Sequence, residues 1–153
     1  MNTIQIRRAI PSDINTLVQF NLAMARETEN KTLDINTLIL GVQSLFQNPQ
    51  FGFYCVGEAE NRAVGQLMIT YEWSDWRNGL FWWIQSVYIH PDFRRQGVYR
   101  QLHEFILNES KIQKACGIRL YVDRDNLSAK KTYIQCGMTE SHYDLFETDY
   151  VLG

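Results

Sequence analysis

Apolar and polar positions in the first fifty residues predict one strand followed by two helices. Ile4 and Ile6 alternate with polar neighbours, as in a short half-buried strand. Ser12 occupies the position of a helix N-cap, and apolar residues recur after it at helical spacing. These residues are Ile14, Leu17, Val18 and Ala25. A second helical pattern runs from Leu33 to Phe46, so the chain is expected to begin β-α-α.

Three segments rich in aromatic and β-branched residues follow and predict strands. They span Phe51–Gly57, Ala63–Trp73 and Leu80–His90. Turns are expected between them at Glu60-Asn61 and at Asn78-Gly79, and the second pair is a strong hairpin signal because both residues tolerate positive φ. The third segment is apolar on both faces, which is typical of a central strand covered on each side. Pro91 is expected to end it, because proline cannot donate to a strand ladder.

The last third of the chain predicts two more helices and further strands. One helix runs from about Val98 to Ala115, with Gly117 expected at its C-terminal end. A strand follows over Ile118–Val122, and a last helix spans Leu127–Cys136. Residues 138–152 leave room for one or two antiparallel strands. The order β-α-α-β-β-β-α-β-α-β-β predicts a mixed α/β (α+β) fold.

Composition narrows the class of protein. With 153 residues, 45% of them hydrophobic and 21% charged, the chain is long enough to bury a core, and residues 1–153 are predicted to form one domain. It contains no apolar run of membrane-spanning length and no apolar N-terminal signal segment. A net charge of -2 argues against a nucleic-acid binder, whose affinity rests on a cationic surface. We therefore expect a cytoplasmic protein with neither membrane nor nucleic acid among its partners.

Cysteine and histidine spacing argues against a metal centre. The three cysteines are too few and too scattered for a metal knuckle or a disulfide framework, and the three histidines lack ligand spacing. We expect reduced thiols and no bound metal.

The densest group of positive charge lies between a predicted strand and a predicted helix. Arg94, Arg95 and Arg100 surround Gly97 there. N–H groups at a helix start lack intrahelical partners and lie at the positive end of the helix dipole, and a glycine lets an anion approach them. The segment therefore predicts a phosphate site, although arginines paired with neighbouring acids at a solvated helix start give the same pattern.

Two motifs resemble those of the GCN5-related N-acetyltransferase (GNAT) superfamily. Its coenzyme A signature, [Q/R]-x-x-G-x-[G/A], is matched by Arg94-Arg95-Gln96-Gly97-Val98-Tyr99, except that Tyr99 replaces the small last residue. A second motif, N-x-x-A-x-x-x-Y-x-x-x-G-[F/M], is matched without a gap from Asn126 to Met138. In that segment Asn126 is expected to cap a helix, and Tyr133 to share a face with the alanine four residues before it.

The resemblance implies a GNAT-type acyl-CoA N-acyltransferase fold, a central mixed and mostly antiparallel sheet with helices on both faces, and acetyl-CoA as co-substrate. It implies that backbone groups of one strand end bind the pantetheine arm and acetyl carbonyl, and that amides of the following loop bind the pyrophosphate. The implied cofactor-binding residues are Val87, Tyr88, Ile89, Arg94, Arg95, Gln96, Gly97, Val98, Tyr99, Arg100 and Asn126.

The resemblance also implies direct transfer of the acetyl group to a primary amine. Tyr133 is the expected general acid, because a phenol of pKa about 10 can donate to a departing thiolate of pKa about 8.5. Residues 71–76 and 85–91 are similar to the diamine acetyltransferase branch, but Gln85 stands where that branch has a glutamate. Because glutamine takes no proton, Glu72 on the neighbouring strand is the candidate base, directly or through water. A solvent-facing strand glutamate is an equally good interpretation of Glu72.

The acceptor stays open between small-molecule and peptide amines. Acidic side chains could attract a cationic amine, and tryptophans could form its walls. The residues considered for this are Glu27, Glu29, Asp34, Asp75, Trp73, Trp76 and Trp83. The alternative function is a non-catalytic acyl-CoA-binding module, which the departures at Tyr99 and Gln85 favour. The aromatic C-terminal tail is compatible with a homodimer.

Overall fold

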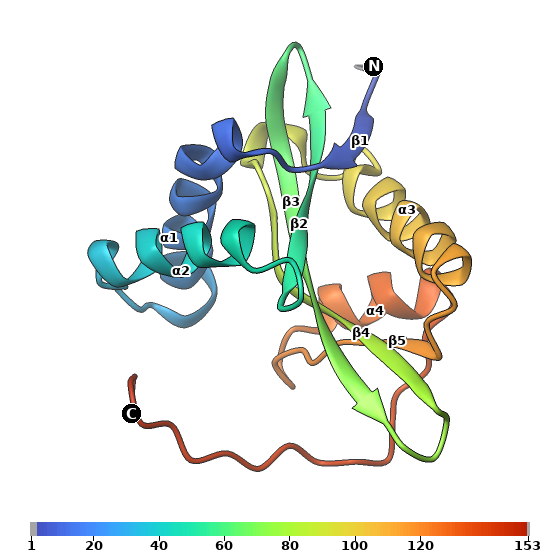
Figure 1. Ribbon diagram of the computed structural model, residues 1–153. Helices are drawn as coiled ribbons and strands as arrows, with labels where there is room; N and C mark the ends of the chain where they lie inside the picture. The colour runs from blue at the N-terminus through green and yellow to red at the C-terminus, as the bar shows by residue number, and fades with distance from the viewer. Residues whose placement is uncertain (1–2, 153) are drawn as a thin grey trace. The chain divides into compact units, whose positions relative to one another are not determined.

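The computed structural model describes residues 3–152, which divide into two compact units. One unit ends at Tyr121 and the other begins at Val122 (Figure 1). In the part of the chain that is described, no helix is long and apolar enough to cross a membrane. The expectation that residues 1–153 form a single domain stays a prediction.

A five-stranded sheet in the order β1-β2-β3-β4-β5 organises the first unit (Figure 1). Its strands are β1 (Gln5–Arg8), β2 (Gly52–Ala59), β3 (Arg62–Ser74), β4 (Gly79–Ile89) and β5 (Gly117–Arg119). Strands β1 to β4 pair antiparallel, and β5 runs parallel to β4. Asn78 has a φ of 47° in the predicted hairpin turn between β3 and β4. The mixed, mostly antiparallel sheet is therefore confirmed.

Helices cover both faces of this sheet, as predicted. Helices α1 (Ile14–Glu29) and α2 (Ile35–Gln47) lie on one face, and α3 (Val98–Ile112) lies on the other (Figure 1). Because side chains alternate along each strand, the two faces carry separate cores. The α1/α2 core includes Leu17, Val42, Tyr54 and Val56, and the α3 core includes Leu67, Ile69, Leu102 and Ile106.

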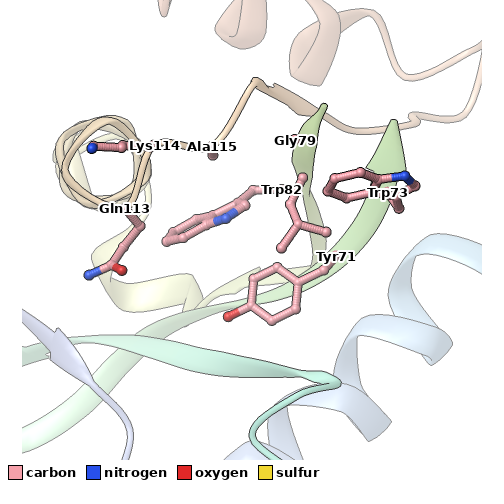
Figure 2. Close-up of a pocket in the computed structure, with 8 residues that line it drawn as sticks. Tyr71, Trp73, Gly79, Trp82, Gln113, Lys114 and Ala115 are labelled. Atoms are coloured by element: carbon pink, nitrogen blue, oxygen red, sulfur yellow. The ribbon is translucent and has the colours of Figure 1, made fainter. Parts of the chain in front are cut away.

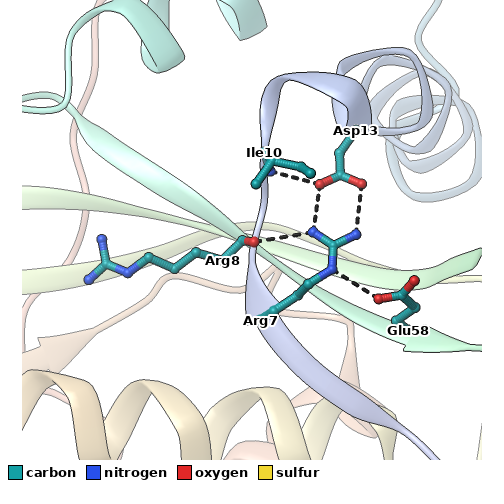
Figure 3. Close-up of polar contacts among 5 residues, drawn as sticks. All are labelled: Arg7, Arg8, Ile10, Asp13 and Glu58. Carbon is teal, nitrogen blue, oxygen red and sulfur yellow. Dashed lines mark hydrogen bonds and ion pairs between the residues drawn. The ribbon is translucent and has the colours of Figure 1, made fainter.

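The start of α1 differs from the sequence expectation, because Ser12 is not its N-cap. A short 3-10 turn precedes the helix and ends at Asp13, whose carboxylate accepts from the Ile10 N–H at 2.8 Å and pairs with Arg7 at 2.8 Å (Figure 3). Arg7 also donates to Glu58 of β2 at 2.9 Å. Burial raises the pKa of Asp13, but Arg7 and the Ile10 N–H outweigh it and hold that pKa below its ordinary value. A contact with the neighbouring strand thus helps to set the start of α1.

The other differences lie in the C-terminal third. Helix α3 ends at Ile112, and Lys114, not Gly117, takes a left-handed φ of 58° there. Gly117 instead begins β5, where a Cβ would come within 2.6 Å of the Phe81 ring. The predicted last helix is present as α4 (Leu127–Gln135). Residues 138–152 form neither helix nor strand, so the expectation of strands in the tail is wrong.

Candidate functional site

The C-terminal half of β4 has a backbone edge that β5 does not cover. Strand β5 pairs only with residues Phe81, Trp82 and Trp83, whereas β4 continues to Ile89. Beyond Trp83, β4 is paired with β3 but with no strand on its other side among residues 3–152. Unpaired strand edges present N–H and C=O groups that can bind an extended chain bearing amides. The predicted cofactor residues Val87 and Tyr88 lie on this stretch with Ile89.

A β-bulge interrupts the same stretch of β4. Gln85 pairs with Met68 of β3 and Tyr88 pairs with Gln66, so β4 has an extra residue between these pairs. Ser86 takes a φ of 52°, a left-handed conformation that is uncommon for a residue other than glycine. The bulge changes the direction in which the backbone groups of Val87 and the residues after it are presented. No sequence motif indicated this feature.

The loop after β4 has the backbone conformation of an anion site. Arg95 and Gly97 have φ values of 61° and 77°, and α3 begins directly afterwards at Val98. Arg95, Gln96, Gly97 and Arg100 are exposed, whereas the Val98 side chain is buried in the α3 core. The first N–H groups of a helix have no intrahelical acceptor and attract anions. No atom lies within 4 Å of the point where a Cβ would project from Gly97, so the approach to these amides is open.

Arg94, the first residue of the signature, contacts other parts of the protein in this structure and not an anion at the loop. Its Nη2 atom lies 2.8 Å from Glu27 Oε2 on α1, and its Nε donates to the Ile89 carbonyl at 2.9 Å. Glu27 Oε1 accepts a further hydrogen bond from the Tyr88 hydroxyl at 3.1 Å. Arg94 therefore links the loop to the end of β4 and to α1, and the Ile89 carbonyl already has a donor.

Tyr99, which departs from the signature, directs its hydroxyl along the helix. Its Oη lies 3.0 Å from Nδ1 of His103, one turn further on, and its ring packs against the α3 core. The contact leaves the loop amides uncovered by the ring. His103 is 1% exposed, and burial lowers its pKa, so the imidazole is neutral at neutral pH.

A row of polar and aromatic side chains lies on the α1/α2 face of β3 and β4. Gln85 Nε2 donates to Thr70 Oγ1 at 2.6 Å. Glu72 Oε1 accepts from Arg119 at 2.8 Å and from the Trp83 indole N–H at 3.1 Å. Glu72 pairs with Phe81, four residues from Gln85, which corresponds to about 13 Å along the strand. The structure therefore does not bring the candidate base Glu72 next to Gln85.

The tryptophans considered as acceptor walls lie on different faces. Trp83 shares the face of Thr70 and packs against Tyr121 in a tilted arrangement, with ring centroids 5.8 Å apart. Trp73 instead shares the opposite face with Tyr71 and Trp82, where these rings line a hollow of about 320 Å³ beside the end of α3 (Figure 2). Only Trp83 of these tryptophans lies on the Gln85 face near the uncovered edge.

The second unit carries the remaining predicted site residues. Asn126 caps α4, and its Oδ1 accepts from the Ala129 N–H at 3.1 Å, as the motif predicted. Gly137 follows the helix with a φ of 92°. Burial raises the pKa of Tyr133, and the nearby Cys136 thiol contributes to the same shift. The Tyr133 phenol therefore keeps its proton at neutral pH.

Within residues 3–152, no group of histidine, cysteine, aspartate or glutamate side chains could hold a metal ion.

Comparisons with known proteins agree with this geometry. Residues 18–138 match the model of the acetyltransferase (GNAT) family. A structure described as a possible acetyltransferase from Clostridium difficile 630 is 42% identical and has a TM-score of 0.89, covering 97% of this chain and 98% of that chain. A predicted acetyltransferase with acetyl-CoA from Clostridium acetobutylicum is 18% identical, with a TM-score of 0.76 over 95% and 96% of the two chains. Glucosamine-6-phosphate N-acetyltransferase from Arabidopsis thaliana is 19% identical, with a TM-score of 0.74 over 95% and 98%. The last two show similarity of fold, and no curated protein matches.

Proposed function

This chain belongs to the GNAT acetyltransferase family and is an acetyl-CoA-dependent acetyltransferase, and from that premise we propose that it acetylates a primary amine by direct attack. The observation that carries the proposal is the uncovered edge of β4, which leads directly into the open loop at the start of α3. This arrangement suits a ligand that has an amide-bearing arm at one end and phosphates at the other. Acetyl-CoA has both parts.

The cofactor would lie first along the uncovered edge of β4 and then over the loop at the start of α3. Those backbone groups of residues 87–89 that face the edge without a partner strand would bind the pantetheine arm, whereas the groups of Tyr88 face β3 at its pairing with Gln66. The amides between Arg95 and Arg100 would bind the pyrophosphate, reinforced by the exposed guanidinium groups. Asn126 would contribute to binding of the pantetheine arm through its side-chain N–H, since its Oδ1 caps α4.

Transfer requires a neutral amine, an acceptor for its proton and a donor for the departing sulfur. The amine nitrogen attacks the thioester carbonyl, and the C–S bond breaks as the new C–N bond is retained. The backbone N–H of Ile89 would stabilise the oxyanion of the tetrahedral intermediate. The Tyr133 phenol, which keeps its proton at neutral pH, would donate to the CoA thiolate.

The proton path from the amine is the step at which this chain differs from the diamine acetyltransferase branch that its sequence resembles. Gln85 replaces the glutamate of that branch, and its amide donates to Thr70. Because Glu72 lies about 13 Å along the strand from Gln85, it would receive the proton of the amine through a chain of water molecules and not by direct contact. Its pairing with Arg119 keeps this carboxylate in position on the same face.

The acceptor would approach on the face that carries Trp83 and Tyr121. Their tilted rings provide an apolar wall, and Tyr121 is 60% exposed. A small-molecule or peptide amine fits this proposal, with the ammonium form attracted by aromatic faces before it loses its proton.

A panel assay tests the proposal. Acetyl-CoA is mixed with the protein and with polyamines, amino acids, aminoglycosides or lysine peptides, and the thiol released is measured against reactions without amine. We expect thiol release with at least one amine class and loss of this release in Tyr133→Phe. Tyr143→Phe, which changes an exposed tyrosine of the same unit, should remain active.

The presence of glutamine at position 85, where the diamine acetyltransferase branch has a glutamate, also favours a second function, which is binding of acyl-CoA without turnover. Tight CoA binding with no thiol release across the panel would support that second function.

A further inference from the structure

Four polar side chains gather between the sheet and α1, directly under the β4 bulge. Gln66 of β3 is fully buried, and Tyr54 of β2 and Asn21 of α1 are each 5% exposed. Gln66 Nε2 donates to the carbonyl of Ser86 at 2.9 Å. Asn21 Nδ2 donates to the Tyr54 hydroxyl at 3.4 Å, and the Ser86 side chain lies close enough to this hydroxyl to lower the Tyr54 pKa against the effect of burial. Two strands, β3 and β2, therefore contact the single residue that forms the bulge, and Asn21 of α1 contacts the Tyr54 hydroxyl beside it.

This buried polar cluster lowers the stability of the fold. A buried polar group is destabilising unless all its hydrogen bonds are made. The amide of Gln66 must direct its nitrogen toward the Ser86 carbonyl, because its oxygen would face another acceptor in the flipped orientation. In the orientation that results, Gln66 Oε1 has no hydrogen-bond partner in the described part of the chain. An apolar side chain would fill this strand position without that cost, so stability alone does not explain a glutamine.

The backbone of Ser86 explains what the cluster does. A left-handed φ of 52° is disfavoured for serine, and such conformations persist where surrounding contacts hold them. Gln66 holds the carbonyl of this residue by a hydrogen bond, and the Ser86 side chain lies beside the Tyr54 hydroxyl. If Ser86 returned to an extended conformation, the register of β4 with β3 would shift, and the residues that follow would turn to the other face.

We propose that Gln66 and Tyr54 are positioning residues, which hold Ser86 in its left-handed conformation and so direct the backbone of residues 87–89 toward acetyl-CoA. Neither side chain touches the cofactor in this proposal. It rests on the proposed function, because residues 87–89 are the expected pantetheine site.

The test separates cofactor binding from folding. Gln66→Met preserves the length of the side chain and removes its amide, and Tyr54→Phe removes only a hydroxyl. We expect both variants to stay folded and to raise the Kd for CoA and the KM for acetyl-CoA by about 10-fold or more, because small displacements of binding groups have large effects. Ser110→Ala is the matched control, since it removes a buried hydrogen bond to the Leu107 carbonyl in α3 far from the bulge. Its Kd should match that of the wild type.

A second change tests the conformational argument itself. Glycine adopts positive φ readily, so Ser86→Gly combined with Gln66→Met should recover part of the lost CoA affinity. Unchanged Kd and KM in folded Gln66→Met and Tyr54→Phe would overturn the proposal, and so would a double variant no better than Gln66→Met. If Gln66→Met does not fold, Tyr54→Phe alone decides between these outcomes. Isothermal titration with CoA also tests the premise separately, because wild-type protein that fails to bind CoA contradicts the proposed function rather than the role of Gln66.

Discussion

Removing the Tyr99 hydroxyl should weaken the fold without weakening cofactor binding. The hydroxyl lies 3.0 Å from Nδ1 of His103, whose side chain is almost fully buried, and Nε2 of that ring has no hydrogen-bond partner within residues 3–152. Tyr99→Phe therefore takes the hydroxyl contact from a buried imidazole. Loss of such a partner costs about 1–3 kcal/mol. At about 2–4 °C per kcal/mol for a protein of this size, Tm should fall by about 2–12 °C.

The assay compares thermal unfolding with the kinetics of acetyl-CoA use. Because the hydroxyl faces His103 rather than the loop amides, the KM for acetyl-CoA should stay within about twofold of the wild type. Tyr143→Phe, at an exposed position, serves as the control and should change neither quantity. A KM raised about tenfold with an unchanged Tm would refute the reasoning, since it would mean that the hydroxyl contacts the cofactor.

Three further predictions concern the proposed chemistry and the buried histidine. Tyr133→Phe should lower kcat by about 100-fold or more with little change in the KM for acetyl-CoA, and steady-state turnover at the wild-type rate would remove Tyr133 as the general acid. Glu72→Gln should displace the acid limb of the kcat/KM pH profile, and a superimposable profile would exclude Glu72 as the proton acceptor. Burial lowers the pKa of His103 below its ordinary value of 6.5. The unfolded chain therefore takes up a proton at this residue at a higher pH than the native state does. The free energy of unfolding measured in urea should therefore decrease as the pH is lowered from about 7.5 to 5.5. In His103→Gln this decrease should be smaller. An equal slope in both proteins would contradict the prediction.

Features of the fold that depend on residues close together in the sequence could be predicted from the sequence. The Asn78-Gly79 hairpin follows from the tolerance of both residues for positive φ, and the Asn126 cap follows from a side chain that reaches an N–H three residues away. The loop around Gly97 was recognisable for the same reason. The first strand and the helices were predicted to within a few residues, because their apolar periodicity matches the faces that they bury.

Features that depend on distant contacts could not be predicted. Ser12 had the chemistry of an N-cap, but contacts of Asp13 with Arg7 and the Ile10 N–H set the start of α1. Gly117 had the chemistry of a helix end, but the Phe81 ring occupies the space that a Cβ would need there. Residues 138–152 left room for one or two strands but form none. In each case local preference was too weak to determine the outcome.

The sequence by itself determined the family, the loop that is expected to bind phosphate and the tyrosine proposed as general acid, because each of these depends on residue types at fixed spacing. Only the tertiary structure decided the uncovered edge of β4, the bulge at Ser86 and the separation of Glu72 from Gln85. These features depend on strand register and on side chains from neighbouring strands. Register is set by the summed packing of whole strands and not by any single residue, so no motif records it.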